Sequence, residues 1–349
     1  MELNRSNITT PVVGPEPWED FLAGAIMAIT GLSGMLVYSM FIIVVIMVKE
    51  YRTNAYHKLA ATLGCLDMIC LFGMTFYCVP SIILRTDGGH WLNVSFGSSL
   101  IFSWYTGLPI ICALAFNRYY CVCRRQDYKE AFSDRRIYIV FTVALCLGIV
   151  YLVLPLLDCC NFKFYPTEYG WGWNLEHMGG FIINYLELSL TCLVVLIATL
   201  LNAKVFITYR KMHKDISNDS DADAKAEAVR REREFKLFVQ FFIIISWMTL
   251  FDAVFVIAPF VTPSKWFFLF ITWMWIVHCS INGWVYILMN KNMRKRAVAI
   301  FCGAGVKEDE KTEHTKSTAT AMRDGQRRVS SVVANLPNRP PLTMVKTAF

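Results

Sequence analysis

Long, mostly uncharged stretches alternate with shorter polar ones along the chain. Seven of them reach the roughly 20 residues that a helix needs to cross the hydrocarbon core of a bilayer. They are Phe21–Val48, Leu59–Leu84, Phe96–Asn117, Ile137–Leu157, Phe181–Ala203, Leu237–Phe260 and Trp266–Met289. Each is too long for a transmembrane strand, and backbone groups in lipid must bond within their own helix. The pattern therefore predicts an all-α membrane protein, a bundle of seven transmembrane helices.

Polar segments flank these stretches and divide the rest of the chain. The N-terminal tail covers residues 1–20, the bundle residues 21–290, and a polar C-terminal tail without periodicity, predicted to be disordered, residues 303–349. Between bundle and tail, residues 291–302 place basic side chains beside apolar ones, which predicts a short amphipathic helix on the membrane surface. Cys302 at its end is a candidate for palmitoylation.

The composition supports a membrane protein and points away from catalysis. Hydrophobic residues make up 55% of the chain and charged residues only 17%, unlike a soluble domain. The sequence has no glycine-rich phosphate loop, no His and Cys cluster at metal-ligand spacing, and no Ser and His arrangement for nucleophilic attack. We therefore expect a protein of the lipid bilayer that is not an enzyme, has no metal centre and has no nucleic-acid partner.

The distribution of basic residues predicts the orientation in the membrane. Only four of the 34 Lys and Arg residues fall in the N-terminal tail or in the second, fourth and sixth loops, namely Arg5, Arg85, Lys163 and Lys265. Because basic loops stay in the cytoplasm, the N-terminus is predicted outside and the C-terminus inside, in the plasma membrane. The first helix would act as the insertion signal, since the tail before it lacks the features of a signal peptide. Three N-glycosylation sequons lie on the predicted outer side, at Asn4, Asn7 and Asn93.

The third stretch ends at an arginine that faces the cytoplasmic side. From a helix start near Val94, Arg118 lies about 36 Å further along the axis, which is roughly the thickness of the hydrocarbon core. Its guanidinium is always charged, so it must face water, a partner protein or the inside of the bundle. The alternative is an arginine at the membrane edge whose side chain only reaches the interface.

Three carboxylates lie within the predicted spans: Asp67 near mid-membrane, and Glu187 and Asp252 in the outer half. A charged side chain at the centre of a membrane helix costs about 3 kcal/mol unless it faces the bundle interior, so each carboxylate is a candidate functional group. The alternative is that they only hydrogen-bond to neighbouring helices. A sodium ion near Asp67 is conceivable, although the site is incomplete.

A ligand pocket needs a few polar groups among apolar and aromatic walls. The outer halves of the spans offer the candidates Phe102, Ser103, Asn184, Tyr185, Glu187, Asp252 and Trp273. The aromatic outer loop over residues 158–173 reads either as an interfacial belt or as a lid over a cavity, and its length favours the lid. Cys78 could form a disulfide with Cys159 or Cys160, and the sequence does not select between them.

Several motifs together resemble rhodopsin-like G-protein-coupled receptors. They are the seven spans, Asn117-Arg-Tyr119 closing the third span, Asp67 in the second and Asn282-Gly-Trp-Val-Tyr286 closing the seventh. In detail, residues 24–301 are similar to the nematode serpentine receptors of class x, a chemosensory group. That likeness rests on Phe116–Tyr119, Phe162–Trp171, Arg231–Lys236, Trp266 and Trp275–His278 running into Tyr286–Asn290.

The resemblance implies coupling to a heterotrimeric G protein and activation by an extracellular small molecule or peptide. It implies that Asn117, Arg118 and Tyr119 meet the G protein or an inactive-state partner. Asp67, Asn282 and Tyr286 would then form a central switch.

The chain also differs from the pattern of rhodopsin-like receptors at several positions. Asn117 replaces the usual acid before Arg118, which removes a salt bridge and favours higher basal activity. Asn93 stands where a cysteine of the outer disulfide would be expected. The last span has no lysine for a retinal Schiff base, which argues against an opsin, and residues 96–104 have no carboxylate for a cationic amine, which argues against an aminergic receptor. We expect His278 to be packed in the core.

Two further functions stay open from the residues alone. A transporter or ion channel could use the intramembrane carboxylates as an ion path, but no internal repeat or paired broken helices favour it. An insect-type odorant channel would place the N-terminus inside, against the charge distribution. In the C-terminal tail, Ser330 and Ser331 follow a basic pair typical of kinase sites, and the chain end weakly matches a peptide for a PDZ-type protein. Arrestin is a further candidate partner there.

Overall fold

The structure is a computed structural model that describes residues 16–216, 239–240, 242–255, 257 and 264–302. Six described helices are long and apolar enough to cross a membrane, and a shorter apolar helix covers Phe242–Phe255 within the predicted sixth span. The remainder of that span lies outside the described residues. The all-α bundle predicted from the hydrophobic pattern is thus confirmed.

The long helices follow the predicted spans closely. They are α1 (Pro17–Met47), α3 (Ala55–Gly73), continued by a π-helical turn over Met74–Cys78 and by α4 (Val79–Leu84), α5 (His90–Cys123), α7 (Asp134–Val153), α8 (Met178–Ile216) and α10 (Lys265–Met289). Shorter helices join them: α2 (Lys49–Thr53), α6 (Tyr128–Ala131), 3-10 turns over Arg125–Asp127, Leu154–Leu156 and Asp158–Cys160, and α11 (Lys291–Phe301). The expected amphipathic helix after the bundle is therefore present as α11, with Met293 and Ala297 buried.

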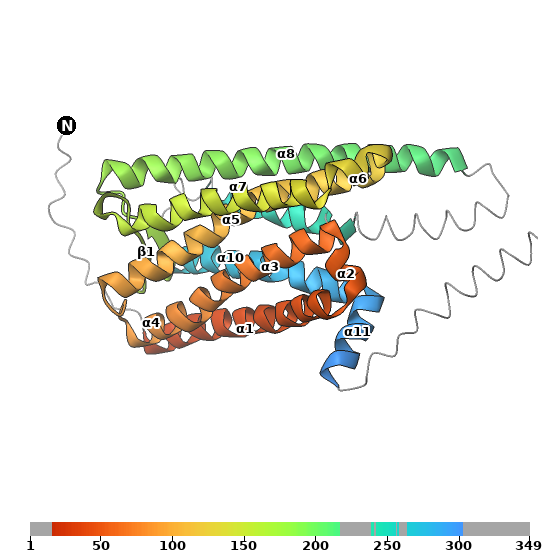
Figure 1. Ribbon diagram of the computed structural model, residues 1–349. Helices are drawn as coiled ribbons and strands as arrows, with labels where there is room; N and C mark the ends of the chain where they lie inside the picture. Colours follow the sequence, from red (N-terminus) through yellow and green to blue (C-terminus); the bar gives the residue numbers. More distant parts are fainter. Residues whose placement is uncertain (1–15, 217–238, 241, 256, 258–263, 303–349) are drawn as a thin grey trace, which may run out of the picture. The chain divides into compact units, whose positions relative to one another are not determined.

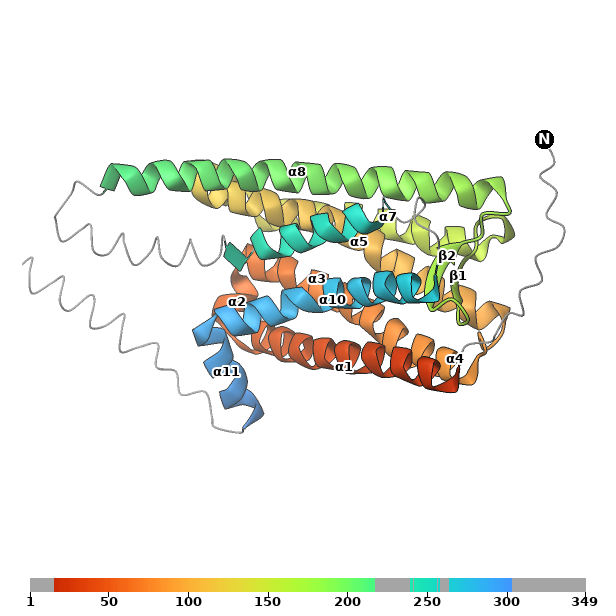
Figure 2. The same cartoon turned by 180° about the vertical axis from the view of Figure 1, so that it is seen from behind.

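The order of packing within residues 17–298 follows from the apolar faces of the helices. α5 packs against α3, α7 and α8, while α1 packs against α3 and α10. Figures 1 and 2 show these helices running side by side, with α4 and the hairpin of β1 (Phe162–Tyr165) and β2 (Gly170–Trp173) at one end of the bundle and α2 at the other. Among the described residues, the loops predicted to lie outside and those predicted to lie inside are therefore at opposite ends of the bundle.

The aromatic outer loop folds into a β-hairpin, which the sequence did not predict as such. β1 (Phe162–Tyr165) pairs antiparallel with β2 (Gly170–Trp173), in the register Phe162 opposite Trp173 and Tyr165 opposite Gly170. Phe162 and Phe164 are buried between the helix ends, so the loop packs into the bundle rather than forming a belt at the membrane interface.

Two residues of α5 hold the hairpin against the bundle. The Asn93 amide donates to the Phe164 carbonyl (2.8 Å) and accepts from the Phe164 amide (2.7 Å). One turn further, a Cβ on Gly97 would lie 2.1 Å from the Phe162 carbonyl oxygen, so only glycine permits this close approach. At the position where the resemblance leads one to expect a disulfide cysteine, the chain has an asparagine that anchors the same loop by hydrogen bonds.

Candidate functional site

The outer-half carboxylates lie on the bundle-facing sides of their helices. Glu187 on α8 is one turn from the buried residues Ile183 and Thr191, and Asp252 shares a face with the buried Met248 and Ile245. Both carboxylates, which the sequence predicts in the outer halves of their spans, thus lie on the sides of their helices that carry buried residues.

Glu187 and Asp252 differ in their hydrogen bonds. Glu187 accepts a hydrogen bond from the indole of Trp173 in β2 (2.6 Å), which links α8 to the hairpin. Asp252 is 7% exposed, and its Oδ2 atom has no hydrogen-bond partner. A buried carboxylate oxygen without a partner is costly, which marks this position as a place for a ligand group.

An aromatic cluster adjoins the two carboxylates and draws on three helices and the hairpin. Trp104 of α5 lies with its ring centre 5.8 Å from that of Trp275 and 5.4 Å from that of His278, both on α10. Phe251, the neighbour of Asp252, stacks on His278 at 5.6 Å. Phe162 of the hairpin completes the cluster through an edge contact with Trp275. We call these five side chains the aromatic cluster.

The predicted pocket residues do not all lie near the aromatic cluster. Ser103 is buried and faces inward, but Phe102 lies against Gly148 of α7. The Trp273 indole donates to Thr30 of α1 (3.2 Å), away from the carboxylates. Tyr185 is 54% exposed, on the outward face of α8. Phe102, Trp273 and Tyr185 thus lie apart from the aromatic cluster, and their assignment to a ligand pocket stays a prediction.

The site also contains residues that the sequence did not predict. Asn184 is half-buried on α8, next to the predicted Tyr185. Trp104, Trp173 and Trp275 were not predicted as site residues, and His278 was expected only in the core. Their spacing in the sequence could have identified some of them: Trp275 and His278 lie one turn apart on α10. The residues of β1 alternate between buried and more exposed.

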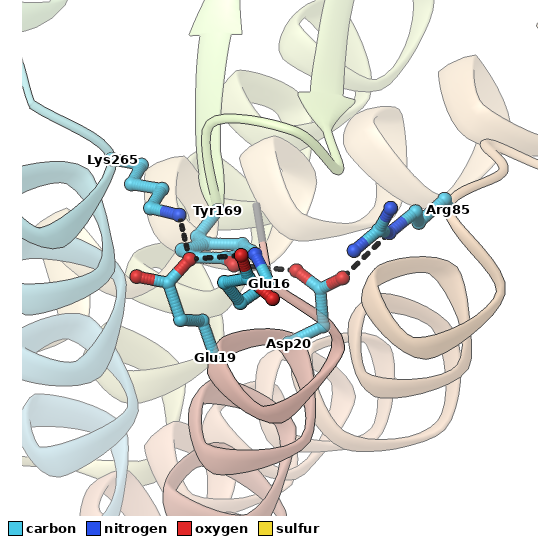
Figure 3. A network of polar contacts seen from close by, with 6 residues as sticks. All are labelled: Glu16, Glu19, Asp20, Arg85, Tyr169 and Lys265. Atoms are coloured by element: carbon cyan, nitrogen blue, oxygen red, sulfur yellow. Dashed lines mark hydrogen bonds and ion pairs between the residues drawn. The ribbon is translucent and has the colours of Figure 1, made fainter. Parts of the chain in front are cut away.

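A polar network connects helix ends and the hairpin at the predicted outer face (Figure 3). Asp20 at the start of α1 accepts hydrogen bonds from Arg85 at the end of α4 (2.7 Å) and from Tyr169 in the hairpin turn (2.5 Å). Burial, together with the hydrogen bond to Asp20, raises the pKa of the Tyr169 hydroxyl, so this group stays protonated and donates. Glu19 pairs with Lys265 at the start of α10. The network therefore joins α1, α4, the hairpin and α10.

In the middle of the bundle, Asp67 of α3 is buried and hydrogen-bonded. Its Oδ2 accepts from the hydroxyl of Tyr38 on α1 and from the amide of Asn282 on α10 (3.3 Å). The expected pairing of Asp67 with Asn282 is present, and Tyr38 is an unpredicted third member. Glycines make room for its ring: a Cβ on Gly64 would lie 2.7 Å from Tyr38, and one on Gly283 would lie 3.2 Å from it.

These contacts fit a hydrogen-bonded carboxylate better than a sodium site. Sodium needs converging oxygen lone pairs, whereas Tyr38 and Asn282 both direct hydrogens at the Oδ2 of Asp67. Within the residues that the structure describes, no group of three or more His, Cys, Asp or Glu could hold a metal ion.

Arg118 is held by an aromatic ring instead of an acid. It is 7% exposed, and its guanidinium carbon lies 3.5 Å from the ring centre of Tyr56 on α3. The Tyr56 hydroxyl donates to that of Tyr286 on α10 (3.2 Å). Arg118 and Tyr286, both predicted switch residues, are thus brought together through Tyr56, which the sequence did not single out.

The neighbours of Arg118 have contacts of their own. The Asn117 amide donates to the hydroxyl of Tyr128 on α6 (3.2 Å), and Tyr119 lies half-buried against Tyr120. Asn117 therefore contacts the short helix after α5 rather than Arg118.

The predicted modification sites differ in whether the folded protein exposes them. Asn93 is 1% exposed, with both ends of its amide bonded to Phe164, which leaves no room for a glycan in the folded protein, so its prediction as a glycan site is corrected. Cys302 is exposed. Asn4, Asn7, Ser330 and Ser331 lie outside the described residues. Cys159 and Cys160 form a disulfide with each other, and Cys78 is free and buried.

Comparisons with known proteins agree with this arrangement. No curated protein matches the chain. Among solved structures, squid rhodopsin matches with a TM-score of 0.73 at 13% identity, covering 90% of this chain and 96% of the squid chain. At that identity the match shows a common fold. The model of the serpentine type 7TM GPCR chemoreceptor Srx family matches residues 29–290. The chain therefore belongs to the Srx family of serpentine chemoreceptors, and it is a membrane receptor that couples to a G protein.

Proposed function

We propose that this chemoreceptor lies in the plasma membrane with its N-terminus outside, and binds an extracellular small molecule or peptide in the outer half of the bundle. The binding groups are Glu187, Asp252 and the aromatic cluster. The observation that carries the proposal is the buried Oδ2 of Asp252, which has no hydrogen-bond partner; Asp252 directly follows Phe251, a member of the aromatic cluster.

At the opposite end, Arg118 is proposed to contact the G protein once it leaves Tyr56. The last turns of α10 connect the two ends, because His278 lies in the aromatic cluster and Tyr286 bonds to Tyr56. A shift of α10 that separates Tyr286 from Tyr56 would free the arginine. This gives a two-state bundle whose equilibrium a ligand can change.

The C-terminal tail is proposed to carry regulatory contacts. Phosphorylation of Ser330 and Ser331 would recruit arrestin, the chain end would bind a PDZ-type protein, and palmitate on Cys302 would anchor α11. Glycans on Asn4 and Asn7 would mark the outer tail. Each of these is a separate proposal that rests on the sequence motif.

The coupling proposal is tested with Arg118→Ala in cell membranes, by G-protein-catalysed nucleotide exchange above that of cells without the receptor. We expect exchange to fall to the background, with surface amounts largely unchanged. Arg124→Ala is the matched control, since Arg124 is an exposed arginine just after α5. Exchange that is equal in the Arg118 variant and the wild type would contradict the proposal.

The topology is tested with an epitope tag placed before Met1. Intact cells should stain with an antibody against the tag, while a tag after Phe349 should stain only after permeabilisation. The reverse pattern would overturn the orientation.

A further inference from the structure

The charges around the proposed ligand site define the chemical class of ligand. Glu187 and Asp252 are both linked to the aromatic cluster. Glu187 is bonded to Trp173, which packs on Phe162, and Asp252 directly follows Phe251, which stacks on His278. Among the described residues, neither forms an ion pair with a Lys or Arg side chain; the described pairs of the outer half involve Asp20 and Glu19 at the helix ends. Within the described part of the chain, the site therefore combines two carboxylates with no positive partner.

Two carboxylates in a membrane interior are expensive together, because the low dielectric strengthens their repulsion and weakens their hydration. An anionic ligand would add to that repulsion. A neutral ligand would leave it unchanged. A cation placed between the two carboxylates would offset it, and this gain would be absent for every other charge class.

The aromatic cluster supplies a second, independent reason to expect a cationic ligand. The faces of Trp104, Trp275 and Phe251 carry negative quadrupole charge, which attracts a desolvated cation placed over such a ring. The indole nitrogen of Trp275 and the Nδ1 of His278 have no hydrogen-bond partner, although these residues are 5% and 3% exposed. They can bond to polar groups on the body of a ligand.

The hairpin fixes one of the two carboxylates. The Trp173 indole bonds to one oxygen of Glu187, and Trp173 in turn packs on Phe162 of the cluster with ring centres 4.9 Å apart. This bond orients the carboxylate while leaving its second oxygen for a ligand. Asp252, which has no such anchor on Oδ2, offers the other acceptor.

We infer that the site binds a protonated amine with an aromatic or apolar body, held between Glu187 and Asp252 and against the rings of the aromatic cluster. This inference rests on the proposed ligand site and names its ligand class. The absence of a carboxylate in residues 96–104 does not exclude amines, because α8 and the Phe242–Phe255 helix supply the acids instead.

The test measures binding directly, so that it does not depend on G-protein coupling. Purified full-length receptor is heated with matched compounds: 2-phenylethylamine against 2-phenylethanol, tryptamine against tryptophol, and 3-phenylpropionate as an anion. We expect at least one amine to raise the unfolding temperature saturably, and its alcohol partner to bind about tenfold or more weakly. The anion should have no effect.

The variants Glu187→Gln and Asp252→Asn should each weaken amine binding by about tenfold or more while keeping the shape of the side chain. Glu168→Gln, at an exposed position in the hairpin turn, is the control and should bind normally. The comparison of amine with alcohol needs no variant, so it tests the preference for a protonated amine even if a variant fails to fold.

Three results would overturn the inference: no amine stabilises the receptor, only neutral or anionic compounds do, or amine binding is unchanged in both carboxylate variants. Failure of the coupling proposal is separate, because it would appear as unchanged nucleotide exchange in Arg118→Ala while amine binding persisted.

Discussion

A single ring contact replaces the salt bridge that the resemblance to rhodopsin-like receptors leads one to expect beside Arg118. Asn117 cannot pair with the arginine and instead bonds to Tyr128, while Arg118 lies over Tyr56. The absence of an acid before Arg118 therefore does not leave the guanidinium unrestrained. Whether basal activity is high depends on the strength of the Tyr56 contact.

Loss of that ring should raise basal activity. Tyr56→Leu removes both the cation–π contact, about 2 kcal/mol when desolvated, and the hydrogen bond to Tyr286. We expect basal nucleotide exchange to rise several-fold. Tyr56→Phe, which keeps the ring, should raise it much less, and the double variant with Arg118→Ala should return to background. Equal exchange in the Leu and Phe variants would argue against the ring contact.

Gly64 makes room for the tyrosine that binds Asp67. A Cβ at this position would lie 2.7 Å from the ring of Tyr38, which is fixed by its bond to the carboxylate. Gly64→Ala should therefore destabilise the receptor by about 1–3 kcal/mol through overpacking, seen as a lower unfolding temperature in detergent. Gly24→Ala is the control, because its nearest atoms lie at an ordinary 3.4 Å.

At the scale of elements, the hydrophobic pattern predicted the helices well because each must be apolar over the membrane thickness. Leu59–Leu84 was expected as one span and is continuous over Ala55–Leu84. The hairpin was harder to predict, because its strands are four residues long and their aromatic side chains suit an interface as well as a core.

The docking of the hairpin should depend on Asn93. Asn93→Asp removes the donor to the Phe164 carbonyl and places a charge in a buried site, and an unsatisfied buried group costs about 1–3 kcal/mol. We expect faster amide hydrogen exchange in a peptide covering residues 161–174. Lys163→Ala, on the more exposed face of β1, should leave exchange in that peptide near wild type. Wild-type exchange in the Asn93→Asp variant would show that other contacts hold the hairpin.

The candidate site was only partly predictable from sequence, for a geometric reason. Depth along a helix can be counted from residue numbers, which is how the sequence places Glu187 and Asp252 in the outer halves of their spans. The direction in which a side chain points depends on the rotation of its helix, which residue numbers alone do not give. Trp273 and Trp275 are two positions apart and have similar chemistry, yet Trp273 bonds to α1 and Trp275 joins the aromatic cluster.

At the scale of the whole molecule, the polar contacts fall into three levels along the bundle. The outer network around Asp20 joins helix ends and the hairpin, the bonds of Asp67 link α1, α3 and α10, and Tyr56 connects Arg118 with Tyr286. α10 takes part at every level, through Lys265, Asn282 and Tyr286. Contacts at either end of the bundle can therefore influence the position of α10.

The tryptophans in and beside the aromatic cluster should allow ligand binding to be followed by intrinsic fluorescence. Trp104 and Trp275 lie against each other, and the indole nitrogen of Trp173 bonds to Glu187, so the emission of these residues is sensitive to charge and hydration at the site. An amine that binds the carboxylates should change the intensity or wavelength of tryptophan fluorescence. Trp173→Phe should reduce this change, whereas Trp91→Phe, at an exposed position near the start of α5, should not. Titration of unlabelled receptor would then follow ligand arrival without any downstream partner.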